Sequence, residues 1–410
     1  MKIAIIGAGI VGVATAHALL DEGHEVLILD KEGPAFGPSR GNAGIIAHTD
    51  VLPLASPNIL RKVPGFLLDP LGPLAIRLGY LPQLLPWLTR FLLAARPADY
   101  ERSIAGIIAL QQLALPAWLA RAEKAGLMGH IHRRGVLYAY RDANDTAGLE
   151  KLAERQRAAG IAIDMLQPQE LRQMEPALKD RFAGAAFHPE AAHISDPLSL
   201  TMALFETALA RGAEFEKAKV DNISMGERPA LIGPDGWQRV VDRVVVAAGA
   251  WSKPLAAAMG DKVPLDTERG YNVSFPGVTG LTSRPVGFKD DGFIMTPLES
   301  GLRIGGAVEF GGLHAPPNHA RTKALYDKAA TLVEGLPAFD SGNLWMGFRP
   351  SLPDSLPVIG RASRNPNVLY AFGHGHYGMT QSTATAGLIA DLIAERRPAI
   401  DLGHFSPQRF

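Results

Sequence analysis

The sequence predicts a two-domain α/β protein, in which a parallel sheet covered by helices is joined to a second domain built on an antiparallel sheet. The first 30 residues show the order strand, tight turn, helix, strand. From Leu265 to Glu309, short apolar runs alternate with Gly/Pro turns, as in antiparallel sheets. The chain has 410 residues, of which 47% are hydrophobic, and this is enough to fill two cores.

The N-terminal segment predicts a βαβ unit. Ile3–Ile6 and Val26–Leu29 are short apolar runs suited to buried parallel strands, and Val11–Asp21 between them is a helix of small residues that Gly23 ends. A βαβ unit requires a parallel sheet with helices on its faces.

Hydrophobic patterns predict the remaining elements. Residues 83–127 are expected to be helical, with breaks at Pro86 and Pro97. The other expected helices cover residues 147–159, 197–211 and 378–396, and the other expected strands cover residues 134–140, 214–220 and 239–247. Segments typical of the parallel sheet stand both before and after those typical of the antiparallel sheet. Both domains are therefore expected to be discontinuous.

Charge and cysteine content exclude several kinds of protein. Lys+Arg and Asp+Glu number 41 each, so no net charge attracts nucleic acid. The chain has no cysteine, which removes disulfides, thiolate metal sites and cysteine nucleophiles. We therefore expect a protein of the cytoplasm. The 12 histidines show no metal-ligand spacing, and no G-x-S-x-G turn indicates a hydrolase.

The segment Gly7-Ala8-Gly9-Ile10-Val11-Gly12 has the G-x-G-x-x-G pattern of a dinucleotide-binding turn. It follows a predicted strand and opens a helix, and Asp30 ends the next strand 18 residues after Gly12. The glycines permit a tight turn and a close approach to a pyrophosphate, and the helix N-terminus supplies N–H groups. Asp30 would bind a ribose. A glycine-rich turn without a ligand is the alternative, and the motif alone does not separate FAD from NAD.

Three further segments favour FAD. Ser39–Gly44 lies beyond the second strand, where it can follow an extended dinucleotide. Val244–Ala248 is a buried strand that leads into Gly249-Ala250-Trp251-Ser252. The glycine-rich segment Gly373–Thr380 precedes a long helix, whose dipole could stabilise an anionic reduced flavin.

These segments together resemble the D-amino-acid oxidase superfamily of flavoproteins, in particular bacterial D-amino acid dehydrogenases. The resemblance spans nearly the whole chain. It also includes Gly347-Phe348-Arg349-Pro350 and Pro353–Gly360. Asp30 stands where many relatives have Glu, and the His376–Tyr377 pair replaces smaller residues. The resemblance implies a Rossmann-like FAD-binding domain at 1–85, 144–260 and 338–410 and a substrate domain at 86–143 and 261–337. With no cysteine, the FAD is expected to be non-covalent.

Arg349 matches the family's arginine that binds the substrate carboxylate, and a guanidinium suits this role because it can form a bidentate contact. An ion pair with Asp354 is the structural alternative. Tyr271 is a second candidate for the carboxylate, or else an ordinary aromatic residue of a strand. Among the histidines, His374 and His376 stand beside the flavin segment, and His48 is a further candidate.

The residues expected to contact FAD come from six parts of the chain. They are Gly7, Gly9, Ile10, Val11, Gly12, Asp30, Lys31, Ser39, Asn42, Ala43, Gly44, Val220, Ala248, Gly249, Trp251, Gly375, Tyr377, Gly378, Met379 and Thr380. No metal site is expected.

The resemblance implies oxidative deamination of a small amino acid, with D-amino acids first, including cyclic ones such as D-proline or hydroxyproline. Hydride would pass from Cα to flavin N5. Two alternatives stay open: a sarcosine- or glycine-type amine oxidase that uses oxygen, and a flavin-binding subunit without catalysis. The electron acceptor could be a quinone, an electron-transfer protein or oxygen.

Residues 66–97 are rich in Leu, Pro and Trp, but their longest uncharged run, Leu78–Thr89, has 12 residues. A membrane-spanning helix needs about 20, so we expect none here. The simpler interpretation is core packing against the substrate domain. The alternative is peripheral contact with the inner membrane face, with Trp87 near the headgroups and Arg77 and Arg90 facing water.

Overall fold

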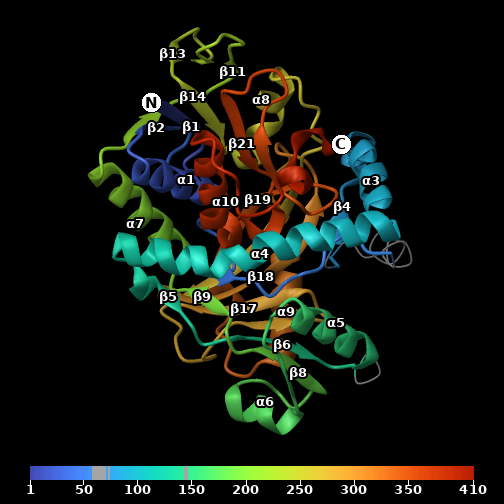
Figure 1. Ribbon diagram of the computed structural model, residues 1–410. Coiled ribbons are helices and arrows are strands. Elements are labelled where there is room, and N and C mark those ends of the chain that lie inside the picture. The colour runs from blue at the N-terminus through green and yellow to red at the C-terminus, as the bar shows by residue number, and fades with distance from the viewer. Residues whose placement is uncertain (58–70, 73, 143–145) are drawn as a thin grey trace.

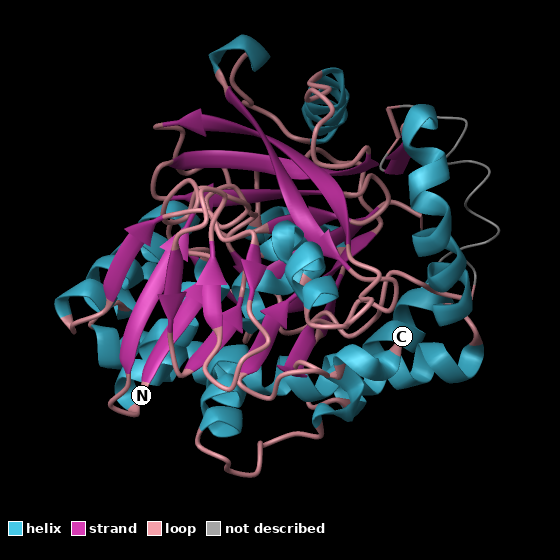
Figure 2. Cartoon of the chain, turned by 90° about the horizontal axis from the view of Figure 1, so that it is seen from above, coloured by secondary structure: helices cyan, strands magenta, loops and turns pink. Residues whose placement is uncertain are grey.

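The structure is a computed structural model, and it describes residues 1–57, 71, 72, 74–142 and 146–410. A six-stranded sheet contains both ends of the predicted βαβ unit (Figures 1 and 2). Its strands, in spatial order, are β10 (Glu214–Lys217), β2 (Glu25–Asp30), β1 (Lys2–Ile6), β14 (Arg243–Val246), β21 (Val368–Phe372) and β20 (Val358–Arg361). All neighbours are parallel except β20 and β21. The chain order reverses at β1, between β2 and β14, which creates a crevice at the carboxyl ends of these strands.

The central strands of this sheet bury both faces, whereas the edge strand β10 is partly exposed. In β1, Ile3 and Ile5 face a helical layer, whereas Ala4 and Ile6 face the opposite core. The helical layer consists of α1 (Ile10–Asp21), α4 (Pro97–Ala125), α7 (Pro197–Ala210) and α10 (Gly378–Ile393). The opposite face is covered by α8 (Ser252–Ala258) and by a three-stranded sheet of β11 (Asn222–Ile223), β12 (Ala230–Ile232) and β13 (Gln238–Val240). Burial on both faces explains the continuous apolar runs in the sequence.

The second large sheet has nine strands and is mostly antiparallel. Its path is β19 (Asn343–Ser351), β15 (Asp266–Pro276), β18 (Gly301–Phe310), β17 (Phe293–Leu298), β16 (Val286–Phe288), β6 (Val136–Tyr140), β8 (Gly184–His188) and β7 (Asp164–Leu166), and β4 (Leu74–Ile76) pairs with β18. One face packs against α9 (Ala320–Leu332) and α6 (Pro168–Met174). Gly270, Asn272, Arg303 and Gly305, from β15 and β18, line a cavity.

The smaller elements complete the chain. A three-stranded sheet joins β3 (Ile45–Ile46), β9 (Ala192–Ile194) and β5 (Ile131–His132). The other helices are α3 (Leu81–Ala94) and α5 (Thr146–Ala158). The 3₁₀ turns are Leu78–Tyr80, Met128–His130, Gly249–Trp251, Phe339–Ser341, Gly375–Tyr377, Leu402–Phe405 and Pro407–Arg409.

Three expectations from the sequence need correction. Pro86 does not break a helix: it lies inside α3, and the break comes at Pro97, where α4 begins. The expected strand at 239–247 is two strands, β13 and β14, which belong to different sheets. Sheet membership also departs from the predicted domain boundaries, because β4, β7, β8 and β19 lie in the nine-stranded sheet, while α4 packs on the helices of the other domain. The residues 143–145, at one of those boundaries, lie outside the described chain.

Helix α4 is long and apolar enough to cross a membrane by length and composition. Half of its most apolar stretch is buried within the protein. Ile107, Leu110 and Trp118 belong to the same core as α1 and α10, and the Trp118 indole donates a hydrogen bond to the Met379 carbonyl at 2.7 Å. In this fold α4 is therefore a core helix, and it crosses the front of the molecule in Figure 1.

The described part of the apolar segment 66–97 packs partly inward, while residues 66–70 and 73 lie outside the described chain. Leu84 and Trp87 form a small core with Phe310, and the Trp87 indole donates to the Ser351 carbonyl. Arg77 is paired with Glu309. Core packing, the simpler interpretation, agrees with these contacts, whereas the alternative that places Trp87 near membrane headgroups and Arg77 in water does not. Other leucines of this segment remain exposed, among them Leu78 and Leu85.

The turn after β1 depends on the absence of side chains. A Cβ atom on Gly12 would lie 1.9 Å from the Gly7 carbonyl oxygen, so α1 packs on β1 as the motif predicts.

We expect Gly12→Ala to lower the free energy of unfolding by about 1–3 kcal/mol, because the helix must shift away from the strand. Gly387, in the middle of α10, has open space around its Cα. The matched change Gly387→Ala should raise stability by about 0.5–1 kcal/mol, because alanine favours the helix. Chemical denaturation of both variants measures the difference, and equal effects would contradict the packing role of Gly12.

Candidate active site

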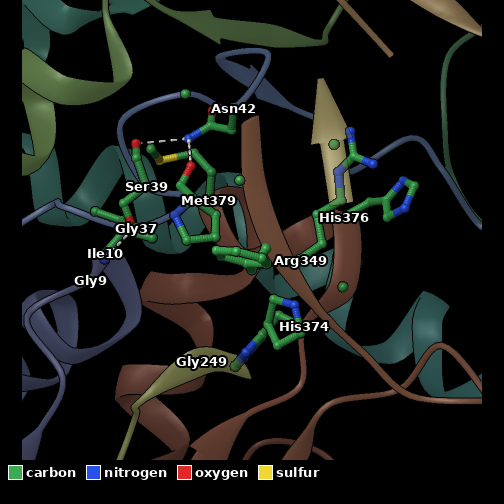
Figure 3. A pocket seen from close by; sticks show the side chains of 18 of the residues that line it. Gly9, Ile10, Gly37, Ser39, Asn42, Gly249, Arg349, His374, His376 and Met379 are labelled. Carbon is green, nitrogen blue, oxygen red and sulfur yellow. Dashed lines mark hydrogen bonds between the residues drawn. The ribbon is translucent and has the colours of Figure 1, made fainter. Parts of the chain in front are cut away.

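A large cavity of about 1430 Å³ lies between the two large sheets. It runs from the turn after β1 and the end of β2, past Gly249 and Met379, to Arg349 and His376 on the antiparallel side. Figure 3 shows Gly9, Ile10 and Ser39 on one side of this cavity, and Arg349 and His376 on the other. Binding sites for drug-sized ligands measure about 300–1,000 Å³, so this cavity has room for an extended dinucleotide and a small substrate.

Close backbone packing forms the end of the cavity that lies at the turn after β1. Gly7 has a φ of +117°, and a Cβ atom there would lie 2.3 Å from the Ala247 carbonyl oxygen at the end of β14. The Ile10 N–H, in the first turn of α1, donates to the Ser39 hydroxyl at 2.9 Å. The Asp30 carboxylate accepts from the Ala8 N–H at 2.9 Å. Ser39 and Asp30 therefore line the cavity beside the start of α1 with a hydroxyl and a carboxylate, polar groups that suit a dinucleotide.

The antiparallel sheet holds the loop of residues 37–44 against this end. The Arg303 guanidinium donates to the Asn42 carbonyl at 2.7 Å, and the Asn272 amide donates to the Gly41 carbonyl at 2.7 Å. The Asn42 side chain in turn accepts from the Gly44 N–H at 2.8 Å. The antiparallel sheet thus fixes the segment Ser39–Gly44, which the sequence assigned to the cofactor.

The structure brings most of the predicted cofactor residues to the cavity wall. These are Gly7, Gly9, Ile10, Val11, Asp30, Lys31, Ser39, Asn42, Ala43, Val220, Ala248, Gly249, Trp251, Gly375, Tyr377, Gly378 and Met379. Three others do not line it. Gly12 packs on Gly7, Gly44 lies against Leu298 and Ile194, and the Thr380 hydroxyl accepts from the Ala47 N–H at 2.9 Å. Their roles are in shaping the turn, the loop and the start of α10.

His48 is not at this cavity. It lines a separate cavity of about 200 Å³ with Gln111 and Glu190, and its Nδ1 lies 3.2 Å from the Ile46 carbonyl. Its neighbours Ala47 and Asp50 do reach the large cavity. Sequence position could not distinguish these residues, because the chain turns just after β3. The expectation that His48 acts in catalysis is therefore not supported by its placement.

Arg349 lies at the far end of the cavity on β19. Its guanidinium donates to the Ala307 carbonyl at 3.0 Å and forms no salt bridge with a carboxylate of the described residues. Asp354, the alternative partner, pairs with Arg409 at 2.7 Å instead. A Cβ atom on Gly270 would lie 2.4 Å from the Arg349 Cζ, so the guanidinium rests across β15 only because residue 270 is glycine. Arg349 is thus free to bind an anion.

Glu268 stands directly opposite Arg349 in the register of β15 and β19. It is 1% exposed, its Oε2 lies 2.6 Å from the His376 Nε2, and its Oε1 accepts a hydrogen bond from Ser351. Burial by itself raises the pKa of the Glu268 carboxyl, but His376, Ser351 and the charge of Arg349 together hold that pKa below its ordinary value. Glu268 is therefore an ionised carboxylate with two hydrogen-bond partners.

His374 and Tyr271 are used for structure. His374 is buried with its Nε2 3.0 Å from the Thr385 hydroxyl, and burial lowers its pKa to about 3, so it is neutral. The Tyr271 hydroxyl donates to Glu309 at 2.6 Å and accepts from the Asn318 N–H. Both residues contribute to the cavity wall, and the His374 Nε2 and the Tyr271 hydroxyl already have partners within the protein.

Sequence reasoning missed three polar residues near His376, at the far end of the cavity. Glu268 stood in the segment beside Tyr271 without being chosen. Asp50 and Tyr138 line the cavity, and the Tyr138 hydroxyl donates to Asp50 at 3.3 Å. Burial raises the pKa of Asp50 to about 6, although the Tyr138 hydrogen bond opposes this. The distance of Asp50 and Tyr138 from every recognised motif left no signal to find them.

Comparison with known proteins agrees with this geometry. The model of the family described as FAD dependent oxidoreductase matches residues 2–392. The chain is 39% identical to a D-amino-acid oxidase from Bradyrhizobium diazoefficiens, with 100% of this chain and 98% of the relative covered. It is 30% identical to a D-amino acid dehydrogenase from Rhizorhabdus wittichii, with 100% of both chains covered.

Solved structures show the same fold. Glycine oxidase from Geobacillus kaustophilus matches with a TM-score of 0.79 and 24% identity, over 100% of this chain and 99% of the other. L-proline dehydrogenase from P. horikoshii matches with a TM-score of 0.76 and 20% identity, over 100% and 97% of the two chains. Since the family model covers nearly the whole chain and the cavity offers the donors that a dinucleotide requires, the protein belongs to the family of FAD-dependent oxidoreductases.

Proposed function

We propose that this enzyme oxidises the Cα–N bond of small D-amino acids. The observation that carries the proposal is Arg349, a guanidinium that lines the cavity and forms no salt bridge with a carboxylate of the described residues. A planar guanidinium in such a position can bind the carboxylate of an amino acid with two parallel hydrogen bonds. The two relatives named above supply the substrate class, as a D-amino-acid oxidase and a D-amino acid dehydrogenase.

The residues of the chain then bind and orient the substrate. Gly7, Gly9, Ser39 and Asp30 would hold the adenosine diphosphate part of FAD, and the segment Gly375–Met379 at the start of α10 would face its ring system. FAD, when bound, supplies the acceptor for the hydride that leaves Cα. Arg349 fixes the carboxylate and so directs the Cα–H, while the enclosing sheets exclude water. The resulting imino acid reacts with water to give a 2-oxo acid and ammonia.

We expect D-alanine and D-proline to bleach the flavin absorbance of the purified protein under anaerobic conditions faster than their L-enantiomers. The physical reason is that, with the carboxylate fixed at Arg349 and the side chain confined by the cavity wall, only one enantiomer can point Cα–H toward the flavin. A stopped-flow spectrophotometer measures both rates. Sarcosine and glycine serve as comparison substrates, since a secondary-amine oxidase is the runner-up. Equal rates for both enantiomers, or bleaching by sarcosine alone, would contradict the proposal.

We expect Arg349→Lys to weaken substrate binding while FAD content stays unchanged. The loss of a bidentate contact costs roughly 1.5–3 kcal/mol, or about ten- to 150-fold, and should appear mainly in KM. The control is Arg155→Lys, at an exposed arginine that pairs with Glu101. Steady-state kinetics with an artificial electron acceptor measure the effect. An unchanged KM for every substrate would assign Arg349 a structural role.

We propose further that the protein contacts the cytoplasmic face of a membrane and passes its electrons to an acceptor there. Leu78, Leu85 and Leu92 are 82%, 53% and 41% exposed, and an exposed apolar patch on α3 and the turn before it suits peripheral contact with lipid. We expect the protein to float with liposomes of phosphatidylethanolamine and phosphatidylglycerol, and the triple change of these leucines to Ser to abolish flotation. Leu84 and Trp87 are left intact because they are buried. A parent protein that stays wholly in the soluble fraction would overturn this proposal.

A further inference from the structure

The pair of His376 and Glu268 has no role in the function proposed so far. His376 belongs to the turn Gly375–Tyr377 before α10, and its side chain lies at the cavity next to Arg349 (Figure 3). Glu268 reaches the same place from β15. Three chain segments far apart in the sequence therefore bring an imidazole, a carboxylate and a guanidinium together.

The geometry fixes which ring nitrogen faces which partner. The His376 Nε2 lies 2.6 Å from the Glu268 carboxylate, and the low pKa of Glu268 means that this oxygen is an acceptor. Nε2 must therefore carry the proton, and in the neutral ring Nδ1 is then the basic atom. Nδ1 makes no hydrogen bond to any residue in the described ranges. His376 is partly exposed, with 33% of its side chain accessible, so the ring can contact a ligand in the cavity.

Oxidation of an amino acid requires such an atom. The substrate enters with its amino group protonated, and an ammonium nitrogen has no lone pair to form the C=N bond as hydride leaves Cα. One proton must therefore leave the nitrogen first. The amino group is bonded to the same Cα as the carboxylate, and His376 lies at the cavity wall beside Arg349, so a substrate bound at Arg349 has its amino group near the imidazole.

We propose that His376 is a catalytic residue whose Nδ1 accepts this proton, and that Glu268 is a positioning residue that holds the imidazole. The inference rests on the proposed function. The N–H bond of the ammonium breaks and an Nδ1–H bond forms, which leaves a neutral amine. Cα then loses hydride to the cofactor, and the nitrogen lone pair forms the C=N bond of a protonated imine. Water converts the imine into a 2-oxo acid and an ammonium ion.

The surroundings of His376 suit a transient positive charge on the ring. Glu268, from β15, compensates that charge directly, and Arg349, from β19, becomes neutralised when it binds the substrate carboxylate. Asp50, from the loop after β3, also acts electrostatically on His376. Tyr377 is in the same turn, and burial raises its pKa well above the ordinary value, so it stays neutral. Asp50 is the competing base, but its carboxyl already accepts a hydrogen bond from Tyr138.

The test uses the FAD-loaded enzyme and four variants, of which Asp50→Asn examines the competing base. His376→Gln keeps an amide N–H for Glu268 but has no basic atom. Glu268→Gln removes the charge that orients the ring. His314→Asn is the control, because this histidine is exposed and does not line the cavity. The rate of anaerobic flavin bleaching by D-alanine is measured across pH. We expect His376→Gln to lose about 100-fold or more near neutral pH, the effect of a missing general base.

The pH dependence separates catalysis from structure. At alkaline pH the amine of free D-alanine is already neutral, so the rate of His376→Gln should return close to that of the parent. Glu268→Gln should show a smaller loss in the same direction, and His314→Asn should show none. An equal loss at every pH, or no loss near neutral pH, would overturn the proposal. So would an alkaline-rescued loss in Asp50→Asn that His376→Gln does not show.

A binding measurement provides a readout apart from turnover. 2-Aminoisobutyrate has an ammonium and a carboxylate but no Cα–H, so it binds without oxidation. Calorimetry in buffers of different ionisation heat counts the protons that move on binding. We expect the pH dependence of this count to change in His376→Gln and not in His314→Asn, and identical profiles would count against the proposal. If no D-amino acid bleaches the parent enzyme, the proposed function itself fails, and this outcome is distinct from any difference between variants.

Discussion

The turn between β1 and α1 is packed so closely that the cavity depends on it. A side chain on Gly7 would meet the Ala247 carbonyl, and a side chain on Gly12 would meet the Gly7 carbonyl. These contacts place the first N–H groups of α1 and the carboxyl ends of β1 and β14 around one opening. The crevice exists because the strand order reverses at β1. The residues that the nine-stranded sheet contributes to the cavity, from Arg303 to Arg349, lie over this opening.

Charge balance governs the other end of the cavity. Burying an isolated ion is costly, so buried charges are found with partners. Glu268 meets this requirement with His376 and Ser351, and Glu309 meets it with Arg77 and Arg269. Arg349 is different, because its guanidinium has a carbonyl partner and the charge of Glu268 nearby, but no salt bridge of its own among the described residues. In the proposed function, a substrate carboxylate supplies the missing anionic partner of Arg349.

The histidines show where sequence reasoning about a site stops. His374 and His376 are two residues apart in one turn, yet one is buried against Thr385 and the other faces the cavity beside Glu268. The distinction depends on which way each ring points, and this is set by α10 and β15. His48 was a further candidate by sequence, but the chain turns after β3 and directs it to another cavity. Asp50 and Tyr138 carry no motif, and only packing brings them to the substrate end.

The sequence by itself determined the dinucleotide turn, the helix and strands around it and the family, and it singled out Arg349 as the candidate for the carboxylate. These follow from local rules: glycine spacing, apolar periodicity and residue type are read within short segments. Tertiary structure decided which sheet received β7, β8 and β19, because strand pairing joins segments that are far apart in the chain. It also decided that Asp354 pairs with Arg409 and that Glu268 stands opposite Arg349. Such contacts depend on register between distant strands, which no local pattern specifies.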